Sequence, residues 1–237
     1  MDLRYEPLER LHVPRPVDRL SYVADACRGR AVLDLGALDE TAWTSKRGHG
    51  TWLHERIAAV AGRVLGVDSS TAVPDAGLAT GPRATIVRGD IADLDALLGV
   101  HDFRPDVVVA GELIEHVPSP LAFLQALVAS PRLAGCELVL TTPNATAVHN
   151  VIVGLASRES THRDHLCILS YKTLSTLCAR AGLQRWTLVP YRSAFVEMRA
   201  RNPGLRGALV GAAERAVNAV EWLFPLLAFG WIVRATL

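Results

Sequence analysis

The sequence contains very little lysine. Only Lys46 and Lys172 occur in 237 residues, so arginine supplies nearly all of the 25 basic residues, and 24 acidic residues leave a formal net charge of +1. No basic run is present, so the charge pattern predicts no nucleic-acid partner. Half of the residues are hydrophobic and 21% are charged, which excludes a disordered chain and predicts a sizeable core.

Cysteine pairs and long apolar runs are also lacking. The four cysteines form no Cys-x-x-Cys pair, and none stands at zinc-ligand spacing from a histidine, so we expect reduced thiols and a cytoplasmic location. The first residues lack the apolar segment of a signal peptide. The most apolar stretch, Trp222 to Val233, is interrupted by Pro225 and Gly230 and is too short to cross a bilayer, so we expect no membrane span.

Short apolar runs alternate with amphipathic segments along the chain, which predicts strands alternating with helices. The expected strands are 31–35, 63–68, 84–88, 106–110, 137–141, 183–190 and 227–235. The expected helices are 17–27, 51–61, 119–128, 170–182 and 205–223, and we expect a polar loop over 37–50. Strands that are apolar throughout and alternate with helices predict one α/β domain with a doubly wound, mostly parallel sheet of seven strands.

Four motifs follow the expected strands in order. They are Val32-Leu33-Asp34-Leu35-Gly36, Val64-Leu65-Gly66-Val67-Asp68, Arg88-Gly89-Asp90-Ile91, and Val107-Val108-Val109-Ala110 with Glu112-Leu113-Ile114-Glu115-His116-Val117. The ordered series resembles class I methyltransferases that use S-adenosylmethionine. The Glu-His-Val stretch and the later Ser-Tyr-Lys-Thr-Leu are similar to small-molecule methyltransferases of the ubiquinone-biosynthesis O-methyltransferase type. The resemblance covers about residues 15–192.

The resemblance implies a Rossmann-like fold, S-adenosylmethionine as cofactor and S-adenosylhomocysteine as product. It also implies a small-molecule acceptor, with a hydroxyl oxygen as the first expectation, and a role in specialised biosynthetic metabolism. One alternative is a nicotinamide-dependent oxidoreductase, which is disfavoured because no Gly-x-Gly-x-x-Gly follows the first strand. A second alternative is a methyltransferase-like scaffold that binds a ligand or partner without turnover.

Acids at the strand ends are candidate cofactor ligands, because ligands of doubly wound sheets bind beyond the carboxyl ends of the strands. Asp68 is expected on the ribose hydroxyls, although it would also serve as a turn residue. Asp90 is expected on the adenine amine, with Ile91 as an apolar wall, or else as an ordinary loop acid. Asp34 is expected to face the methionine ammonium through water, or else to orient a loop. The other expected cofactor residues are Gly36, Gly48, Gly50, Ser69, Gly111 and Glu112.

The first motif departs from the family pattern. Gly-x-Gly-x-Gly is usual there, but Gly36 is followed by Ala37-Leu38-Asp39-Glu40. We expect Gly48 and Gly50 to restore the close backbone approach, with amides at the start of the next helix holding the cofactor carboxylate. The alternative is a loop that has lost tight cofactor binding.

Histidines are the candidate bases, because methylation of a hydroxyl is helped by proton removal and imidazole titrates near neutrality. His116 and His165 are the leading candidates, followed by His149 and His162. Each of them also has a purely structural interpretation, as a cap or a loop anchor. The pair His162 and His165, with Asp164 between them, suggests a metal site, but the sequence has no matching cluster of ligand residues elsewhere. We therefore expect no metal.

Three parts of the single domain, 1–237, are expected to have different tasks. Residues 1–30 and the helix of the 193–237 segment would form a lid, and 31–192 would form the cofactor-binding core. The amphipathic segment 205–237 would cover the acceptor pocket, lie on a membrane, form a homodimer contact or simply pack on the core. Residues 144–168 are expected to form part of the acceptor wall.

Overall fold

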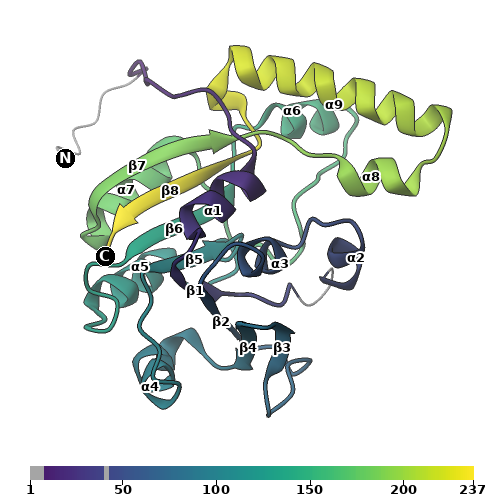
Figure 1. Cartoon of the computed structure of the whole chain (residues 1–237). Coiled ribbons are helices and arrows are strands. Elements are labelled where there is room, and N and C mark those ends of the chain that lie inside the picture. The colour runs from purple at the N-terminus through teal and green to yellow at the C-terminus, as the bar shows by residue number, and fades with distance from the viewer. Residues whose placement is uncertain (1–7, 40–42) are drawn as a thin grey trace.

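An eight-stranded sheet runs through the centre of the computed structural model, which describes residues 8–39 and 43–237 (Figure 1). The strand order across the sheet is β3-β4-β2-β1-β5-β6-β8-β7. The strands are β1 Ala31–Leu35, β2 Arg63–Asp68, β3 Leu78–Gly81, β4 Ala84–Arg88, β5 Val107–Gly111, β6 Glu137–Pro143, β7 Gln184–Tyr191 and β8 Gly230–Thr236. The order reverses at β1, as in doubly wound sheets, so the expected Rossmann-like fold is confirmed.

Helices connect the strands and cover both faces of the sheet (Figure 1). They are α1 Arg19–Cys27, α2 Trp43–Gly48, α3 Leu53–Ala58, α4 Leu94–Val100, α5 Pro120–Ala129, α6 Val148–Leu155, α7 Tyr171–Ala181, α8 Val196–Arg201 and α9 Leu205–Leu223, with short 3-10 turns η1 Ile91–Asp93 and η2 Pro225–Leu227. Ser119 caps α5 ahead of Pro120, and Gly182 ends α7 at a φ of +84°. Both ends were expected from the sequence and are confirmed.

The two faces of the sheet explain why its strands are apolar throughout. Alternate residues of each strand point to opposite faces. Val32 lies in one buried cluster with Val23 of α1 and Ile57 of α3. Leu33 lies in a second cluster, on the face that α5 and α7 cover. Each strand therefore needs apolar residues at both odd and even positions.

The expected strand count of seven was wrong by one. β3 pairs antiparallel with β4 at the edge of the sheet, with Leu78 opposite Ile86 and Ala79 opposite Thr85. The segment is short, and its residues alternate between half-buried and exposed, so it has no apolar run to mark it. The other antiparallel pairings are those of β8, which lies between β6 and β7 and runs against both.

Several helices were also missed. The expected polar loop 37–50 contains α2, whose Trp43 packs on Trp52 with ring centroids 5.7 Å apart. The helix expected over 51–61 is shorter and spans Leu53–Ala58. Helices α4, α6 and α8 were not expected. α6 and α8 are short, with eight and six residues, and neither contains a buried residue.

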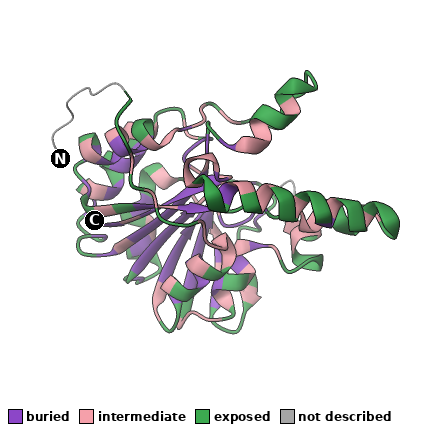
Figure 2. Ribbon diagram, turned by 90° about the horizontal axis from the view of Figure 1, so that it is seen from above, coloured by how far each residue is buried: buried purple, intermediate pink, exposed green. Residues whose placement is uncertain are grey.

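Helices α8 and α9 form an arm between β7 and β8. Figure 2 shows the arm projecting from the body, with most of α9 exposed. Arg199 of α8 pairs with Glu214 of α9 at 2.9 Å, and the buried Glu221 accepts bonds from the backbone and hydroxyl of Ser193 at 2.9 and 2.7 Å. Next to Glu221, at the C-terminal end of α9, the guanidinium of Arg15 stacks on Trp222 at 4.1 Å from the ring centroid. Among the helices in the described ranges, none combines the length and apolar character that a bilayer crossing requires.

Candidate active site

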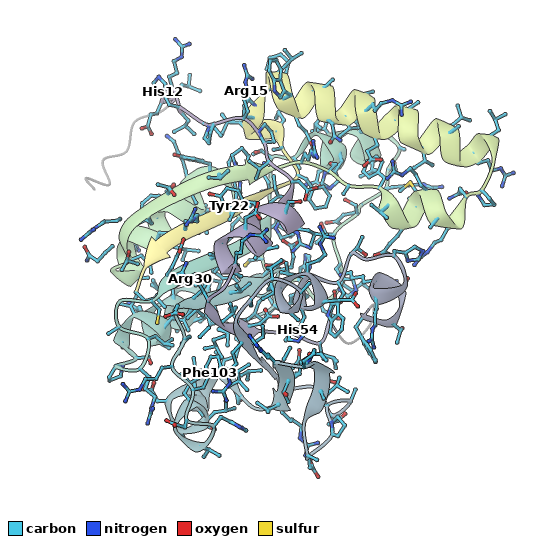
Figure 3. All side chains as sticks on the ribbon, viewed as in Figure 1. His12, Arg15, Tyr22, Arg30, His54 and Phe103 are labelled. Atoms are coloured by element: carbon cyan, nitrogen blue, oxygen red, sulfur yellow. The ribbon has the colours of Figure 1, made fainter. Side chains whose placement is uncertain are left out.

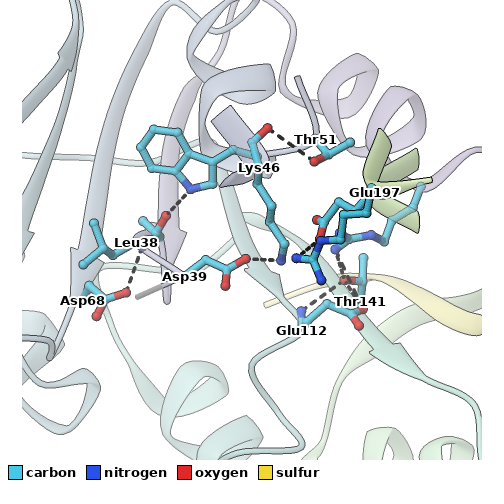
Figure 4. Close-up of polar contacts among 12 residues, drawn as sticks. Leu38, Asp39, Lys46, Thr51, Asp68, Glu112, Thr141 and Glu197 are labelled. Atoms are coloured by element: carbon cyan, nitrogen blue, oxygen red, sulfur yellow. Dashed lines mark hydrogen bonds and ion pairs between the residues drawn. The ribbon is translucent and has the colours of Figure 1, made fainter. Parts of the chain in front are cut away.

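The carboxyl ends of β1, β2, β5 and β6 meet at one edge of the sheet. In the sheet register Leu35 is opposite both Val67 and Ala110, and Gly111 is opposite Thr141. The residues that follow these positions therefore share one edge, which is where doubly wound sheets bind ligands. Figure 4 shows part of this edge, from Leu38 and Asp68 to Glu112 and Thr141.

Asp68 fastens the turn that leaves β1. One carboxylate oxygen accepts from the Leu38 amide at 2.8 Å and the other from the Ser70 amide at 2.9 Å (Figure 4). The side chain is half-buried, and each carboxylate oxygen has a second lone pair for a ligand hydroxyl. Ser69 beside it is exposed. The turn role considered from the sequence is thus present, and the ribose contact stays a prediction.

Gly36 makes the turn that Asp68 fastens. Its φ is +70°, and its amide donates to Val67 at 2.9 Å. A Cβ at this position would lie 3.1 Å from Cδ1 of Leu113, the second residue after β5. Glycine is therefore required both by the backbone angle and by the close approach of the chain that leaves β5.

Asp34 lies in a buried hydrogen-bonded chain. Its carboxylate is 2.8 Å from Nδ1 of His54, and Nε2 of that ring is 2.7 Å from the Thr80 hydroxyl. Asp34 and His54 are 2% and 1% exposed. Figure 3 shows His54 in the interior of the molecule. This chain of hydrogen bonds joins β1, α3 and β3, and a water-mediated contact of Asp34 to an ammonium stays a prediction.

Gly48 and Gly50 lie at the end of α2 and are exposed. The Gly50 amide donates to Arg47 at 3.2 Å, and an added Cβ would meet no atom within 4 Å at either glycine. Among the described residues, no neighbouring atom would therefore prevent a side chain at either position. Lys46 of the same helix pairs with Asp39 (Figure 4).

Asp90 and Ile91 stand at the far side of the same edge. Asp90 is exposed and caps η1 by accepting from the Ala92 amide at 2.9 Å. Ile91 is half-buried and packs on the larger core cluster. An exposed carboxylate beside an apolar side chain fits the adenine contact expected from the sequence, which stays a prediction.

Glu112 is held in a strained backbone position directly after β5. Its φ is +54°, a region that typically costs a non-glycine residue about 1–3 kcal/mol. Its carboxylate accepts from the Tyr191 hydroxyl at 2.8 Å and from the Thr141 hydroxyl at 3.0 Å, and Arg19 of α1 lies 3.8 Å away. Burial and the neighbouring Glu112 raise the pKa of Tyr191 well above its usual value, so this phenol remains a donor.

Space around Gly111 is limited by the same elements. A Cβ there would lie 2.4 Å from Cδ2 of Leu53 and 3.9 Å from the Arg19 guanidinium. Helices α1 and α3 thus approach the end of β5 closely. Of the expected cofactor residues, the structure brings Gly36, Asp68, Gly111 and Glu112 to one edge.

His116 and His165 meet at the end of β5, although they come from distant segments. Their ring centroids are 4.6 Å apart at an interplanar angle of 85°. The Leu166 amide donates to the Glu115 carbonyl at 2.8 Å and fixes the two segments together. Burial and the nearby His116 lower the pKa of His165. The two leading candidate bases, which were chosen independently from the sequence, are therefore in contact, and the role of either one as a base stays a prediction.

Glu115 is a member of this group that the sequence interpretation quoted but did not assign. It is fully buried, and one carboxylate oxygen accepts from the Thr142 hydroxyl at 3.0 Å. The other oxygen has no partner among the described residues. Burial, and then the charge of Glu112, raises the pKa of Glu115 to about 8. A second acid three residues after Glu112 was the signal in the sequence.

A cavity of about 480 Å³ lies between α6 and the loop that follows it, within the 144–168 segment that was expected to form part of the acceptor wall. Its lining mixes amide, hydroxyl and charged side chains with a few aliphatic ones: Ala145, Asn150, Val153, Gly154, Arg158, Glu159, Ser160, Thr161 and Ile168. Asn150 and Ser160 are hydrogen bonded at 3.1 Å. His149 lies elsewhere and stacks on Phe229 at 4.6 Å, whereas His162 is exposed and its ring centroid lies 5.7 Å from that of His165 and 6.3 Å from that of His116.

Comparison with known proteins agrees with this geometry. A profile of the family described as a methyltransferase domain matches residues 13–188. No curated protein sequence matches the chain. Similar solved structures include a SAM dependent methyltransferase from Archaeoglobus fulgidus, with 14% identity over 92% of this chain and 91% of that chain and a TM-score of 0.50.

Two further structures have the same fold. A possible histamine N-methyltransferase from Thermotoga maritima has 13% identity over 92% of this chain and 87% of that chain, with a TM-score of 0.54. Phosphoethanolamine N-methyltransferase 2 from Haemonchus contortus, in complex with S-adenosyl-L-methionine, has 13% identity over 92% and 52% of the two chains, with a TM-score of 0.50. The match over residues 13–188 covers most of this sequence, and the strand ends carry the acids and the glycine of the expected motifs. The chain therefore belongs to the methyltransferase-domain family, as a class I enzyme that takes its methyl group from S-adenosylmethionine.

Proposed function

We propose that this methyltransferase methylates a hydroxyl oxygen of a small molecule in biosynthetic metabolism. The observation that carries the proposal is the contact between two imidazoles, His116 and His165, in a fold whose loop from α6 to α7 supplies both His165 and part of the wall of a cavity of mixed polar and apolar lining. A hydroxyl must lose its proton as it is methylated, whereas a neutral amine attacks through its free lone pair. Groups that assist proton loss therefore favour an oxygen acceptor.

The cofactor is assigned to the strand ends in this proposal. Asp68 would hold the ribose, and Asp90 with Ile91 would hold the adenine. The turn at Gly36 and the chain from Gly111 would line the methionine part. The remaining members of this set are Asp34, Gly48, Gly50, Ser69 and Glu112. The support is that Gly36, Asp68, Gly111 and Glu112 share one edge of the sheet, and that a Cβ at either of the two glycines would crowd a leucine methyl group.

The acceptor is assigned to the cavity between α6 and the loop before α7. Its size of about 480 Å³ suits a small molecule and lies within the usual range of ligand sites. Arg158, Asn150 and Ser160 are the polar groups that would orient an acceptor bearing hydroxyl or anionic groups. The chemistry of this wall favours a polar acceptor over a purely apolar one.

The reaction places few demands on the protein. The acceptor O–H bond and the C–S bond of the sulfonium break, and a C–O bond forms. The electron pair of the C–S bond goes to sulfur, which leaves as a neutral thioether, and the hydroxyl proton is lost at the His116–His165 pair. The protein positions the oxygen in line and excludes water.

A lid of α1, α8 and α9 would provide that exclusion. Arg19 of α1 already reaches the site, since its guanidinium lies 3.3 Å from the Thr141 hydroxyl and 3.8 Å from Glu112. In this proposal the single domain consists of the lid segments 1–30 and 193–237 around the core 31–192.

A panel of acceptors tests the proposal. Matched pairs that differ only in a hydroxyl or an amine are incubated with the full chain and S-adenosylmethionine, and S-adenosylhomocysteine formation is measured by mass spectrometry. We expect turnover of hydroxyl members and a methyl group on oxygen in the product. Methylation on nitrogen or carbon would overturn the choice of acceptor atom.

Two variants test the role of the imidazoles. The double variant with His116→Ala and His165→Ala should lose at least about 100-fold in kcat, the lower range for assisted proton transfer. His101→Ala is the matched control, because His101 is exposed at the end of α4. Full turnover in the double variant would show that positioning alone suffices.

A further inference from the structure

Glu115, His116 and His165 form a compact group of metal-ligand donors. Each side chain offers one atom, and the three atoms all lie within 4.8 Å of one another. Glu115 and His116 lie in the turn four and five residues after the end of β5, whereas His165 comes from the loop between α6 and α7. The backbone bond from Leu166 to Glu115 holds these two segments together.

Two atoms in this group are buried without a hydrogen-bond partner. They are Oε1 of Glu115 and Nδ1 of His165. A buried polar atom without a partner typically costs about 1–3 kcal/mol, so such atoms call for an explanation. Glu115 is 0% exposed, and the bond from Thr142 satisfies only its other carboxylate oxygen. Two such atoms on adjacent side chains indicate that the site is completed by something that accepts lone pairs.

We propose that Glu115, His116 and His165 bind one divalent transition-metal cation that activates the acceptor oxygen. The inference deepens the proposed function and rests on it. One carboxylate and two imidazoles suit zinc or iron(II), and three protein ligands leave a coordination position open. In tetrahedral coordination, bonds of about 2.0–2.2 Å to a shared ion place ligand atoms about 3.4 Å apart. The three donor atoms, which lie within 4.8 Å of one another, would therefore approach one another by at most about 1.4 Å when an ion binds.

In this inference the cation, and not an imidazole acting as a base, would cause the proton loss that the proposed reaction requires, and His116 and His165 would act on the acceptor through the cation that they hold. A hydroxyl oxygen in the open position is polarised and gives up its proton to solvent near neutral pH. The oxygen then attacks the methyl carbon, the C–S bond breaks, and the electron pair remains on sulfur. His116 and His165 stay neutral ligands, and Thr142 orients the carboxylate through its bond to Glu115.

The site differs from the one weighed from the sequence. That candidate consisted of His162, Asp164 and His165, and a metal was not expected because the sequence contains no matching cluster of ligand residues elsewhere. In the structure His162 is exposed and lies 3.5 Å from Asp164. The fold instead brings the end of β5 to His165.

Titration with cobalt(II) tests the inference. Untagged full-length protein is stripped with a chelator, and Co²⁺ is added while its visible absorption is followed. We expect one ion per chain and displacement by Zn²⁺. Glu115→Gln and His165→Asn should weaken binding by more than the roughly 100-fold that loss of an outer partner can cost, and Thr142→Val by roughly 10- to 100-fold. His101→Gln is the matched control and should bind like the wild type.

Calorimetric titration of the same samples with S-adenosylhomocysteine separates the two proposals. Variants that bind the nucleoside normally are folded, so their cobalt affinities can be interpreted. Absence of cobalt binding in protein that binds S-adenosylhomocysteine overturns the metal site and leaves the proposed methylation standing. Equal cobalt affinity in wild type, Glu115→Gln and His165→Asn also overturns it. If the stripped protein does not bind S-adenosylhomocysteine while cobalt binds, the cofactor assignment fails and the metal site stands.

Discussion

The carboxylate of Asp68 accepts a hydrogen bond from the Leu38 amide at 2.8 Å, which ties the end of β2 to the chain leaving β1. The first and second motifs are therefore one structural unit. Asp68 both shapes the turn and faces the edge where the nucleoside is expected. A change at this residue alters the turn and the site together.

Asp68→Asn should weaken S-adenosylhomocysteine binding by roughly 10- to 100-fold. The amide retains one acceptor oxygen, so one of the two backbone donors loses its partner, and a hydrogen bond to a charged group is worth about 1.5–3 kcal/mol. Calorimetric titration measures the loss. Asp102→Asn is a control, because Asp102 is exposed after α4. Unchanged affinity in Asp68→Asn would remove this residue from the cofactor site.

Gly36→Ala should destabilise the fold and weaken cofactor binding. A φ of +70° costs an L-residue roughly 1–2 kcal/mol, and the new Cβ would press on Leu113 at 3.1 Å. Gly135→Ala measures the cost of the positive φ alone, since Gly135 has a φ of +83° and an added Cβ meets nothing within 4 Å. Urea unfolding should show a larger loss for Gly36→Ala than for Gly135→Ala. Equal losses would mean that the approach of Leu113 carries no cost.

His54→Ala should lower the free energy of unfolding by about 3 kcal/mol or more. The change leaves the buried Asp34 carboxylate without its partner and opens a cavity beside Trp52. A double-mutant cycle with Asp34→Asn isolates the pair. An interaction free energy near zero in that cycle would show that the two side chains are independent.

Stability should fall in acid through Glu137, which joins β6 to Arg30 and Arg234. Burial acts to raise the pKa of Glu137, but hydrogen bonds and the charges of the two arginines outweigh it and lower the pKa below its usual value. A lowered pKa in the folded state means that stability is present above the unfolded pKa of about 4.5 and is lost as pH falls through the folded value. Urea unfolding between pH 3 and 7 should show a flatter profile for Glu137→Gln. Parallel profiles would exclude this carboxyl as a source of the pH dependence.

Amides of residues 43–50 should gain protection from hydrogen exchange when S-adenosylhomocysteine binds. α2 has six residues and none is buried, so it opens readily by itself. Exchange followed by mass spectrometry, with and without the nucleoside, measures the gain. Residues 94–100 of α4 serve as an internal reference because Leu94 and Leu98 anchor that helix in the core. Equal protection of 43–50 in both samples would place α2 outside the cofactor site.

The sequence predicted the elements whose signals are local. Asp68 ends an apolar run, and Ser119-Pro120 and Gly182 mark helix ends, so these positions follow from short-range chemistry. β3 was missed because it is stabilised by its pairing with β4 and not by its own composition. α2 was missed because Trp43 packs on Trp52, a contact that only the folded chain makes.

The same distinction applies to the site. His116 and His165 were chosen separately for their chemistry, and their contact depends on the loop that returns to β5. Glu115 was not assigned, because its burial and its free oxygen are properties of the assembled sheet edge. Gly48 and Gly50 were expected to substitute for the missing glycines, and their open surroundings give no sign of that role within the protein itself.

The position of β8 has a consequence for biosynthesis on the ribosome. This strand, Gly230–Thr236, is an inner strand between β6 and β7, although it comes last of the eight in the chain. Until those residues leave the exit tunnel, β6 has an open edge and β7 has no neighbour in the sheet. The nascent chain therefore exposes unpaired strand edges until β8 has emerged from the ribosome, and the sheet is completed when this strand inserts between β6 and β7.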